Sequence, residues 1–92
     1  MYEFPAKIQE AMYQACNFID EQALNLLWQY KIKEKIQSEE YIYILAQAYI
    51  TNFQYERVSN LIEILKKGSV RGKRSAKILQ EMLEGSMDVM DD

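Results

Sequence analysis

The sequence predicts an all-α fold of about five antiparallel helices, paired as helical hairpins, with the last helix capping one end. Helix breakers are scarce, since the 92 residues include one proline and three glycines, and apolar residues between them recur every three to four positions. Acidic or hydroxyl side chains precede two of these periodic segments, as helix N-caps do. A hydrophobic share of 49% is enough for one small core, and 27% charged residues suit a hydrated surface.

The first helix is predicted over residues 5–18, because a proline such as Pro5 suits the first helical turn. Its apolar face contains Ile8, Met12, Ala15 and Ile19. The second helix is predicted over residues 20–36, with Asp20 as its N-cap. The residues expected to face inward from it are Ala23, Leu24, Leu27, Trp28 and Ile32.

The third helix is predicted over residues 39–51, because the hydroxyl of Ser38 is a good acceptor for an unpaired N–H of the first turn. Asn52 is expected to end it, since asparagine tolerates turn conformations. The fourth helix is predicted over residues 55–67. Gly68 is expected to close it in the left-handed conformation that favours glycine.

The fifth helix is predicted over residues 72–84, with Gly85 as its cap. Its apolar face contains Ala76, Leu79, Met82 and Leu83. We expect residues 1–85 to form a single helical domain and residues 86–92 to form a disordered acidic tail.

An internal repeat of about 34 residues relates parts of these helices. The pairs at this spacing are Met12 with Ala46, Ala11 with Leu45, Leu45 with Leu79, and Tyr49 with Leu83. The pattern indicates two stacked hairpins, whose exposed end is covered by the fifth helix. Small side chains at Ala11 and Ala46 are expected to let the two helices of a hairpin approach closely.

The residue types argue against an enzyme. The chain has no histidine and one cysteine, Cys16, which excludes Ser-His-Asp triads, Cys-His pairs and zinc-finger ligand sets. Its acidic pairs, at residues 20–21 and 39–40, stand at predicted helix starts, where carboxylates favour the helix dipole. We therefore expect no catalytic residue, no cofactor, no metal and no small-molecule substrate.

The charge balance points away from nucleic acid. A net charge of −3 and a pI near 5.0 oppose binding to phosphate backbones, which needs a basic footprint. The sequence has neither an apolar run long enough to span a bilayer nor the pattern of a signal peptide. We expect an intracellular protein, cytoplasmic or nuclear, with protein partners, no nucleic acid and no membrane.

The candidate docking surface combines two helices. Tyr43, Gln47 and Ile50 share a region of the third helix, and Gln9 and Tyr13 stand at equivalent places on the first helix. In stacked helical hairpins this face lines a concave groove. These five residues are the predicted partner-binding residues.

A basic run over residues 66–75 permits two interpretations. It is either a helix end matched to its dipole followed by a hydrated loop, or a patch that contacts phosphate or an acidic partner. The acidic tail of a second copy of the chain is one such partner. Exposed ion pairs of that kind are weak and sensitive to salt.

The segments 8–17 and 38–49 contain Ile8-Gln9-Glu10-Ala11-Met12-Tyr13 and Tyr41-Ile42-Tyr43-Ile44-Leu45-Ala46-Gln47-Ala48-Tyr49. They resemble the N-terminal tetratricopeptide repeats of the scaffold subunits of the anaphase-promoting complex, the third subunit in particular. The resemblance covers about residues 8–65. It implies a non-catalytic cell-cycle scaffold of a ubiquitin ligase, whose N-terminal repeats form homodimers.

Two other classes remain open. A small helical chaperone or adaptor, holding one partner helix in its groove, is similarly short, acidic and helical. A regulator that blocks another protein by mimicry is a third reading, and no particular motif supports it. A stable homodimer without cargo favours the scaffold, whereas dependence on one co-expressed partner favours the chaperone.

Overall fold

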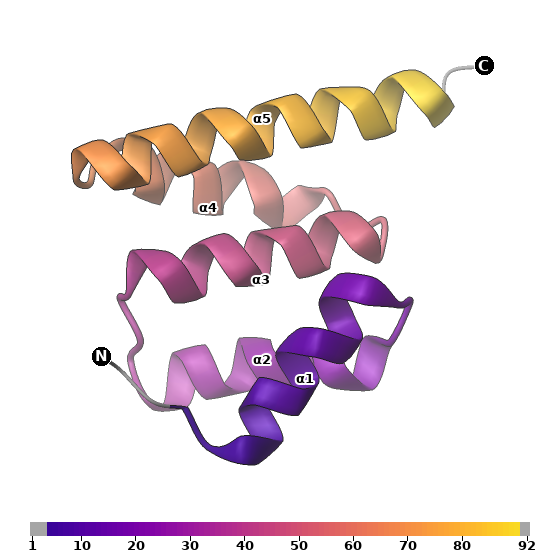
Figure 1. The fold of residues 1–92 in the computed structure, drawn as a ribbon, viewed down its shortest axis with the longest axis vertical. Helices are drawn as coiled ribbons and strands as arrows, with labels where there is room; N and C mark the ends of the chain where they lie inside the picture. Colours follow the sequence, from indigo (N-terminus) through magenta and orange to yellow (C-terminus); the bar gives the residue numbers. More distant parts are fainter. Residues whose placement is uncertain (1–3, 91–92) are drawn as a thin grey trace.

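The computed structural model describes the backbone of residues 4–90 and the side chains of residues 4–85. Its helices are α1 (Ala6–Asn17), α2 (Glu21–Lys33), α3 (Glu39–Thr51), α4 (Glu56–Lys66) and α5 (Val70–Met90). Successive helices run in opposite directions (Figure 1). The predicted all-α fold of about five helices is confirmed.

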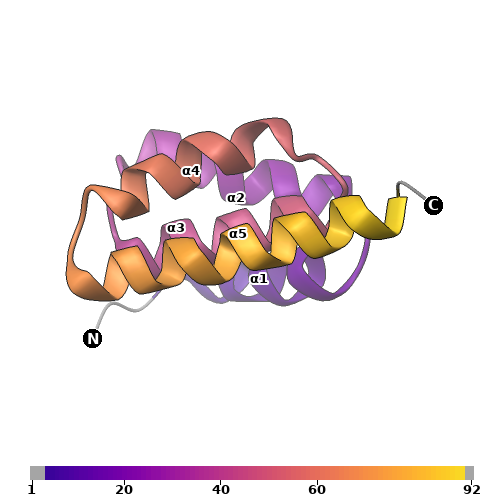
Figure 2. The same ribbon diagram turned by 90° about the horizontal axis from the view of Figure 1, so that it is seen from above.

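The helices form two layers. α1, α3 and α5 make one layer, and α2 and α4 make the other (Figure 2). α3 is the central element, because it packs against each of the other four helices. α5 lies at one end of the stack, in contact with α3 and α4.

One apolar cluster fills the space around α3. Its largest fully buried side chains are Tyr41, Leu24, Leu27, Leu45, Leu65, Leu79 and Val58. Ala11 and Ala46 are both buried. Their helices, α1 and α3, pack against each other, although they belong to different hairpins. The hydroxyl of Tyr41 donates a hydrogen bond of 2.6 Å to the carbonyl of Leu27, so this phenol is buried without losing its polar partner.

Two predicted N-caps are confirmed. The carboxylate of Asp20 accepts a hydrogen bond from the N–H of Ala23 at 3.1 Å, at the start of α2. The hydroxyl of Ser38 accepts one from the N–H of Tyr41 at 3.3 Å, at the start of α3. Each satisfies an N–H that has no partner within its helix.

α2 ends earlier than predicted. Lys35 adopts a left-handed conformation with φ 51°, and the N–H of Ile36 returns to the carbonyl of Lys31 at 3.0 Å. This pattern is the Schellman motif, which stops a helix and turns the chain. As a result Ile36 is buried, whereas Ile32, predicted to face inward, is 58% exposed.

α3 ends in the same motif. The left-handed residue is Phe53, with φ 60°, and not Asn52. The N–H of Gln54 donates to the carbonyl of Tyr49 at 2.9 Å, and the N–H of Phe53 donates to that of Ile50 at 3.1 Å. The predicted left-handed glycine caps at Gly68 and Gly85 are wrong, since no glycine among the described residues has a positive φ.

α5 is longer than predicted. It begins at Val70, because the hydroxyl of Ser69 caps it by accepting from the N–H of Gly72 at 3.1 Å. It also continues through Gly85 to Met90. Most of the predicted acidic tail, residues 86–92, therefore belongs to the last turns of this helix, and residues 91–92 lie outside the described residues.

Gly72 is needed for space beside the backbone, and Gly68 leaves room for the carboxylate of Glu39. A Cβ on Gly72 would lie 2.3 Å from Oε2 of Glu39 and 2.9 Å from the carbonyl oxygen of Leu65, and a Cβ on Gly68 would lie 2.0 Å from the same Oε2. The carboxylate of Glu39 fills this space, where it accepts a hydrogen bond from the N–H of Ser69 at 2.9 Å. The start of α3 is thereby joined to the α4–α5 turn.

Candidate protein interface

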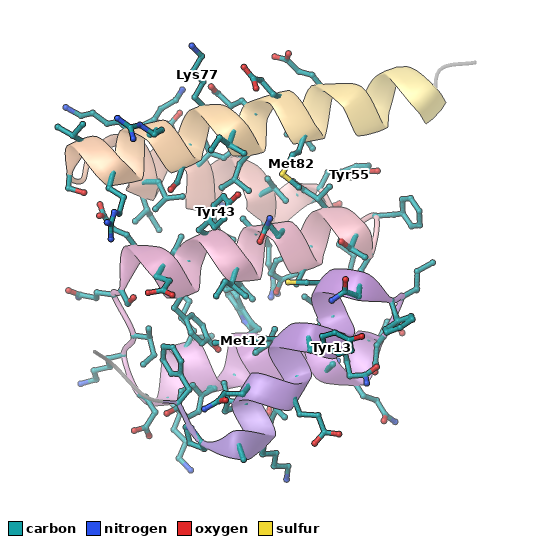
Figure 3. The ribbon with its side chains drawn as sticks, in the orientation of Figure 1. Met12, Tyr13, Tyr43, Tyr55, Lys77 and Met82 are labelled. Atoms are coloured by element: carbon teal, nitrogen blue, oxygen red, sulfur yellow. The ribbon has the colours of Figure 1, made fainter. Side chains whose placement is uncertain are left out.

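Two of the predicted docking residues lie together. Tyr43 and Gln47 are one turn apart on α3, and the amide of Gln47 reaches the hydroxyl of Tyr43 at 3.4 Å. Both side chains are half-buried. Tyr43 points into the space between α3 and α5 (Figure 3).

The hollow beside Tyr43 is built by two helices. It has a volume of about 470 Å³ and is lined by Ser38, Glu39, Glu40, Tyr43, Arg71 and Ser75. Arg71 and Ser75 come from α5, which the sequence did not associate with this site. Their four-residue spacing, one helical turn apart, is the signal that assigns them to one face.

Gln9 and Tyr13 do not extend this hollow. Gln9 is exposed, and its amide donates to the carbonyl of Phe4 at 2.7 Å. Tyr13 lies on α1, away from Tyr43 (Figure 3). Its ring packs edge-on against Phe18, with 6.1 Å between centroids.

Ile50 is not a docking residue. Its side chain is only 6% exposed and belongs to the core cluster. The reason is that α3 is packed by other helices on most of its surface, so positions at the end of the helix are covered as well. The predicted surface therefore loses Ile50 and separates into two regions.

A second region, the turn patch, consists of Tyr13, Phe18, Ile19 and Phe53. Their exposed fractions are 60%, 52%, 69% and 57%. Ile19 was predicted to face inward, but it lies beyond the end of α1, in the α1–α2 turn. The rings of Tyr13 and Phe18 are in contact, and Asn52, which precedes Phe53, bonds the carbonyl of Phe18. Exposed large apolar side chains that lie near one another in this way are typical of interaction surfaces.

A buried asparagine ties together the two turns that carry the patch. Asn52 is the one buried polar residue among those described, at 6% exposure. Its amide nitrogen donates to the carbonyl of Ala15 at 3.0 Å and to that of Ala48 at 2.8 Å, with the carbonyl of Phe18 at 3.4 Å. Its oxygen accepts from the N–H of Asp20 at 2.8 Å.

This network fixes the position of the patch relative to the core. The hydroxyl of Thr51 adds a 3.0 Å hydrogen bond to the carbonyl of Cys16. The last carbonyls of α1 are therefore satisfied by side chains at the end of α3, where the helix itself provides no donors. Phe18 and Phe53 are thus presented from two turns that are held together.

Arg57 lies on α4, in the layer formed by α2 and α4, and its side chain packs against aromatic rings. The guanidinium of Arg57 lies 4.0 Å from the ring centroid of Trp28 and donates to the hydroxyl of Tyr49 at 2.8 Å. Burial raises the pKa of the Tyr49 phenol, and Arg57 opposes that shift. Trp28, predicted to face inward, is half-buried, and Tyr49 is buried.

A hollow of about 510 Å³ adjoins this arginine. It is lined by Asn25, Tyr49, Phe53, Gln54, Tyr55, Glu56 and Arg57. The hydroxyl of Tyr49 uses one of the guanidinium donors. Arg57, on α4, packs on Trp28 of α2 and donates to Tyr49 of α3. We therefore interpret Arg57 as a structural side chain that joins these three helices.

No three Asp, Glu or Cys side chains converge on a possible metal position in the described part of the chain. Burial raises the pKa of the Cys16 thiol, whose Sγ lies 3.4 Å from the carbonyl of Ile44. Over residues 4–90, none of the helices combines the length and apolar character needed to cross a bilayer.

Comparison with the models of known protein families, with curated proteins and with solved structures finds no match to this chain.

Proposed function

We propose that this chain is a non-catalytic protein–protein interaction module that associates with a second copy of itself, as the N-terminal scaffold repeats that it resembles do. The observation that carries the proposal is the turn patch. Burial of large apolar side chains is the main driving force of protein association. This chain leaves Tyr13 on α1, and Phe18, Ile19 and Phe53 on two joined turns, more than half exposed. In a chain of this size, such exposure is best explained by a surface that another protein covers.

The layered arrangement of α1, α3 and α5 supports the same reading. Helical hairpins that stack in this way bury their apolar faces against neighbours and offer long open surfaces for partners. The scaffold interpretation then assigns the chain an intracellular site of action, in the cytoplasm or nucleus, and protein partners in place of a substrate.

The second candidate is a small helical chaperone or adaptor. The observation that favours it is the hollow beside Tyr43, which opens between α3 and α5. A groove between two helices is a common binding site for one amphipathic helix of a partner. In this reading Tyr43 and Gln47 contact the partner, and the chain alone is a monomer.

The test is the solution mass of the full chain, measured by light scattering over a wide range of concentrations. A mass that rises from the 10.9 kDa of one chain towards twice this value supports the self-associating module. A mass of one chain at every concentration rejects self-association and leaves the adaptor. The double variant Phe18→Ser/Phe53→Ser then reports whether the turn patch takes part, with Asn60→Ser on α4 as a matched exposed control.

A further inference from the structure

The hollow beside Arg57 and the turn patch are parts of one surface. Phe53 belongs to the turn patch and also lines the hollow of about 510 Å³. The α1–α2 and α3–α4 turns lie on the same side of the molecule, where α2 and α4 also begin (Figure 1). A protein that covers Phe53 therefore also lies beside the hollow.

The lining of the hollow is suited to a carboxylate. The amides of Asn25 and Gln54 and the guanidinium of Arg57 all carry hydrogen-bond donors. All three side chains are exposed. Hydrogen bonds from an arginine to a carboxylate are stronger than those between neutral groups, because both partners are charged. An acidic side chain of a partner is thus a better ligand for this hollow than an apolar one.

Arg57 is held in place before any partner binds. Its guanidinium lies 4.0 Å from the ring centroid of Trp28, and its bond of 2.8 Å to the hydroxyl of Tyr49 uses one donor. It forms no salt bridge with another described residue. A side chain that is already fixed loses little conformational entropy when it binds a carboxylate. Arginine, tryptophan and tyrosine are also the residue types that most often dominate binding energy at interfaces.

The acidic side chain that borders the turn patch is Glu21. It is the first residue of α2, directly after the turn that carries Phe18 and Ile19, and it is exposed. The neighbouring carboxylate of Asp20 is already used as the N-cap of α2. Like Arg57, Glu21 has no salt bridge with a described residue. One side of the molecule therefore presents a carboxylate and a fixed guanidinium, both next to the same apolar patch.

We propose that Glu21 of one copy enters the hollow of a second copy and pairs with Arg57 there, while the two turn patches pack together. This inference rests on the self-association proposed above and names the polar contact that orients it. A two-fold axis repeats the pair, because contacts in a symmetric dimer are reciprocal. The apolar patches contribute most of the buried area, and the two charged pairs determine how the copies are oriented.

Glu56 limits the strength of this pair. Its carboxylate also lines the hollow, so it repels the carboxylate of Glu21 from the second copy. Glu56→Gln is therefore expected to lower the dissociation constant of the dimer roughly threefold at low salt. A dimer that does not use the hollow would be unaffected by this substitution, and that result would contradict the inference.

Charge reversal at the two positions tests the pair directly, by sedimentation equilibrium of the full chain at low salt. Glu21→Arg and Arg57→Glu each place like charges opposite one another, and each should raise the dissociation constant roughly tenfold or more. An equimolar mixture of the two variants should form a heterodimer, because both contacts again join opposite charges. Formation of this heterodimer also shows that Arg57→Glu folds without its contacts to Trp28 and Tyr49.

A matched control separates the pair from a general effect of charge. Glu34→Arg makes the same change of charge at the exposed far end of α2 and should leave the dimer unchanged. If Arg57→Glu does not fold, the comparison of Glu21→Arg with Glu34→Arg still decides the question, since equal dissociation constants would reject the pair.

The same measurements distinguish this inference from the proposal on which it rests. If the original chain dimerises, Phe18→Ser/Phe53→Ser abolishes the dimer and Glu21→Arg does not weaken it, the pair is wrong and the self-associating module stands. If the original chain is a monomer at every concentration, self-association itself is rejected.

Discussion

The buried amide oxygen of Asn52 accepts a hydrogen bond of 2.8 Å from the N–H of Asp20, and this bond joins the end of α3 to the start of α2. The two residues are 32 positions apart in the chain. Because the same amide also satisfies carbonyls at the end of α1 and within α3, three helix ends depend on one side chain. This is the contact on which the orientation of the turn patch depends.

Asn52→Ala should therefore lower the free energy of unfolding by about 3 kcal/mol, because several buried backbone groups lose their partner. Urea denaturation of the full chain measures the change. Asn60→Ala, at an exposed position of α4, should stay within about 0.5 kcal/mol of the original chain. Equal stability of the two variants would show that the Asn52 network is not needed.

Phe53→Gly should raise the free energy of unfolding by about 1 kcal/mol. Phe53 holds φ at 60°, a conformation that is costly for residues with a Cβ and easy for glycine. Because Phe53 is 57% exposed, little packing is lost. Gln54→Gly is the control, since Gln54 is not among the described positions with positive φ, and it should be neutral or destabilising. A loss of stability in Phe53→Gly would contradict the strained turn.

Replacement by alanine should change the stability of the fold in opposite directions at two glycines of α5, Gly72 and Gly85. Gly72→Ala should destabilise the fold by about 1–3 kcal/mol, since its Cβ would meet the Leu65 carbonyl oxygen at 2.9 Å as well as Glu39. Gly85→Ala has open space around it and lies inside α5. It should stabilise the fold by about 0.5–1 kcal/mol.

The same thermal or urea measurements apply to both variants. If Gly85 instead ended the helix in a left-handed conformation, Gly85→Ala would be destabilising. That result would restore the shorter helix that the sequence predicts and would contradict the continuation to Met90.

The pH dependence of stability should contain a contribution from Glu39. Hydrogen bonds from Ser69, with a smaller effect of the Arg71 charge, lower the pKa of this carboxyl in the folded state. A lowered folded-state pKa means stabilisation that is complete above the ordinary glutamate value of about 4.3 and is lost as the pH falls through the folded-state pKa. Glu39→Gln should remove this part of the acid dependence, whereas Glu10→Gln on the surface of α1 should keep it.

The sequence predicts the fold well where its signals are local. Apolar spacing and the caps Asp20 and Ser38 place the helices close to their observed limits, and the start and end of α3 are as predicted. The errors occur where a contact between distant residues decides the conformation. Gly68 was predicted to end the fourth helix in a left-handed conformation and Gly72 to begin the fifth. In the structure the carboxylate of Glu39, about 30 positions away, occupies the space beside both glycines.

The candidate site was harder to predict. Tyr43 and Gln47 lie together because they are one turn apart, which spacing alone reveals. Ile50 was misassigned because burial at a helix end depends on which neighbours cover it. The turn patch was missed because Phe18, Ile19 and Phe53 lie outside the periodic segments, where the helical period no longer indicates which side chains face inward.

The central claim is that this chain associates with itself through a defined surface. A dilution series of backbone amide spectra of the full chain, recorded by NMR at low salt, tests it most directly. We expect shifts that change with concentration and gather at the turn patch, around Tyr13, Phe18, Ile19 and Phe53, while that of Asn60 on α4 stays constant. Spectra that do not change with concentration would contradict self-association.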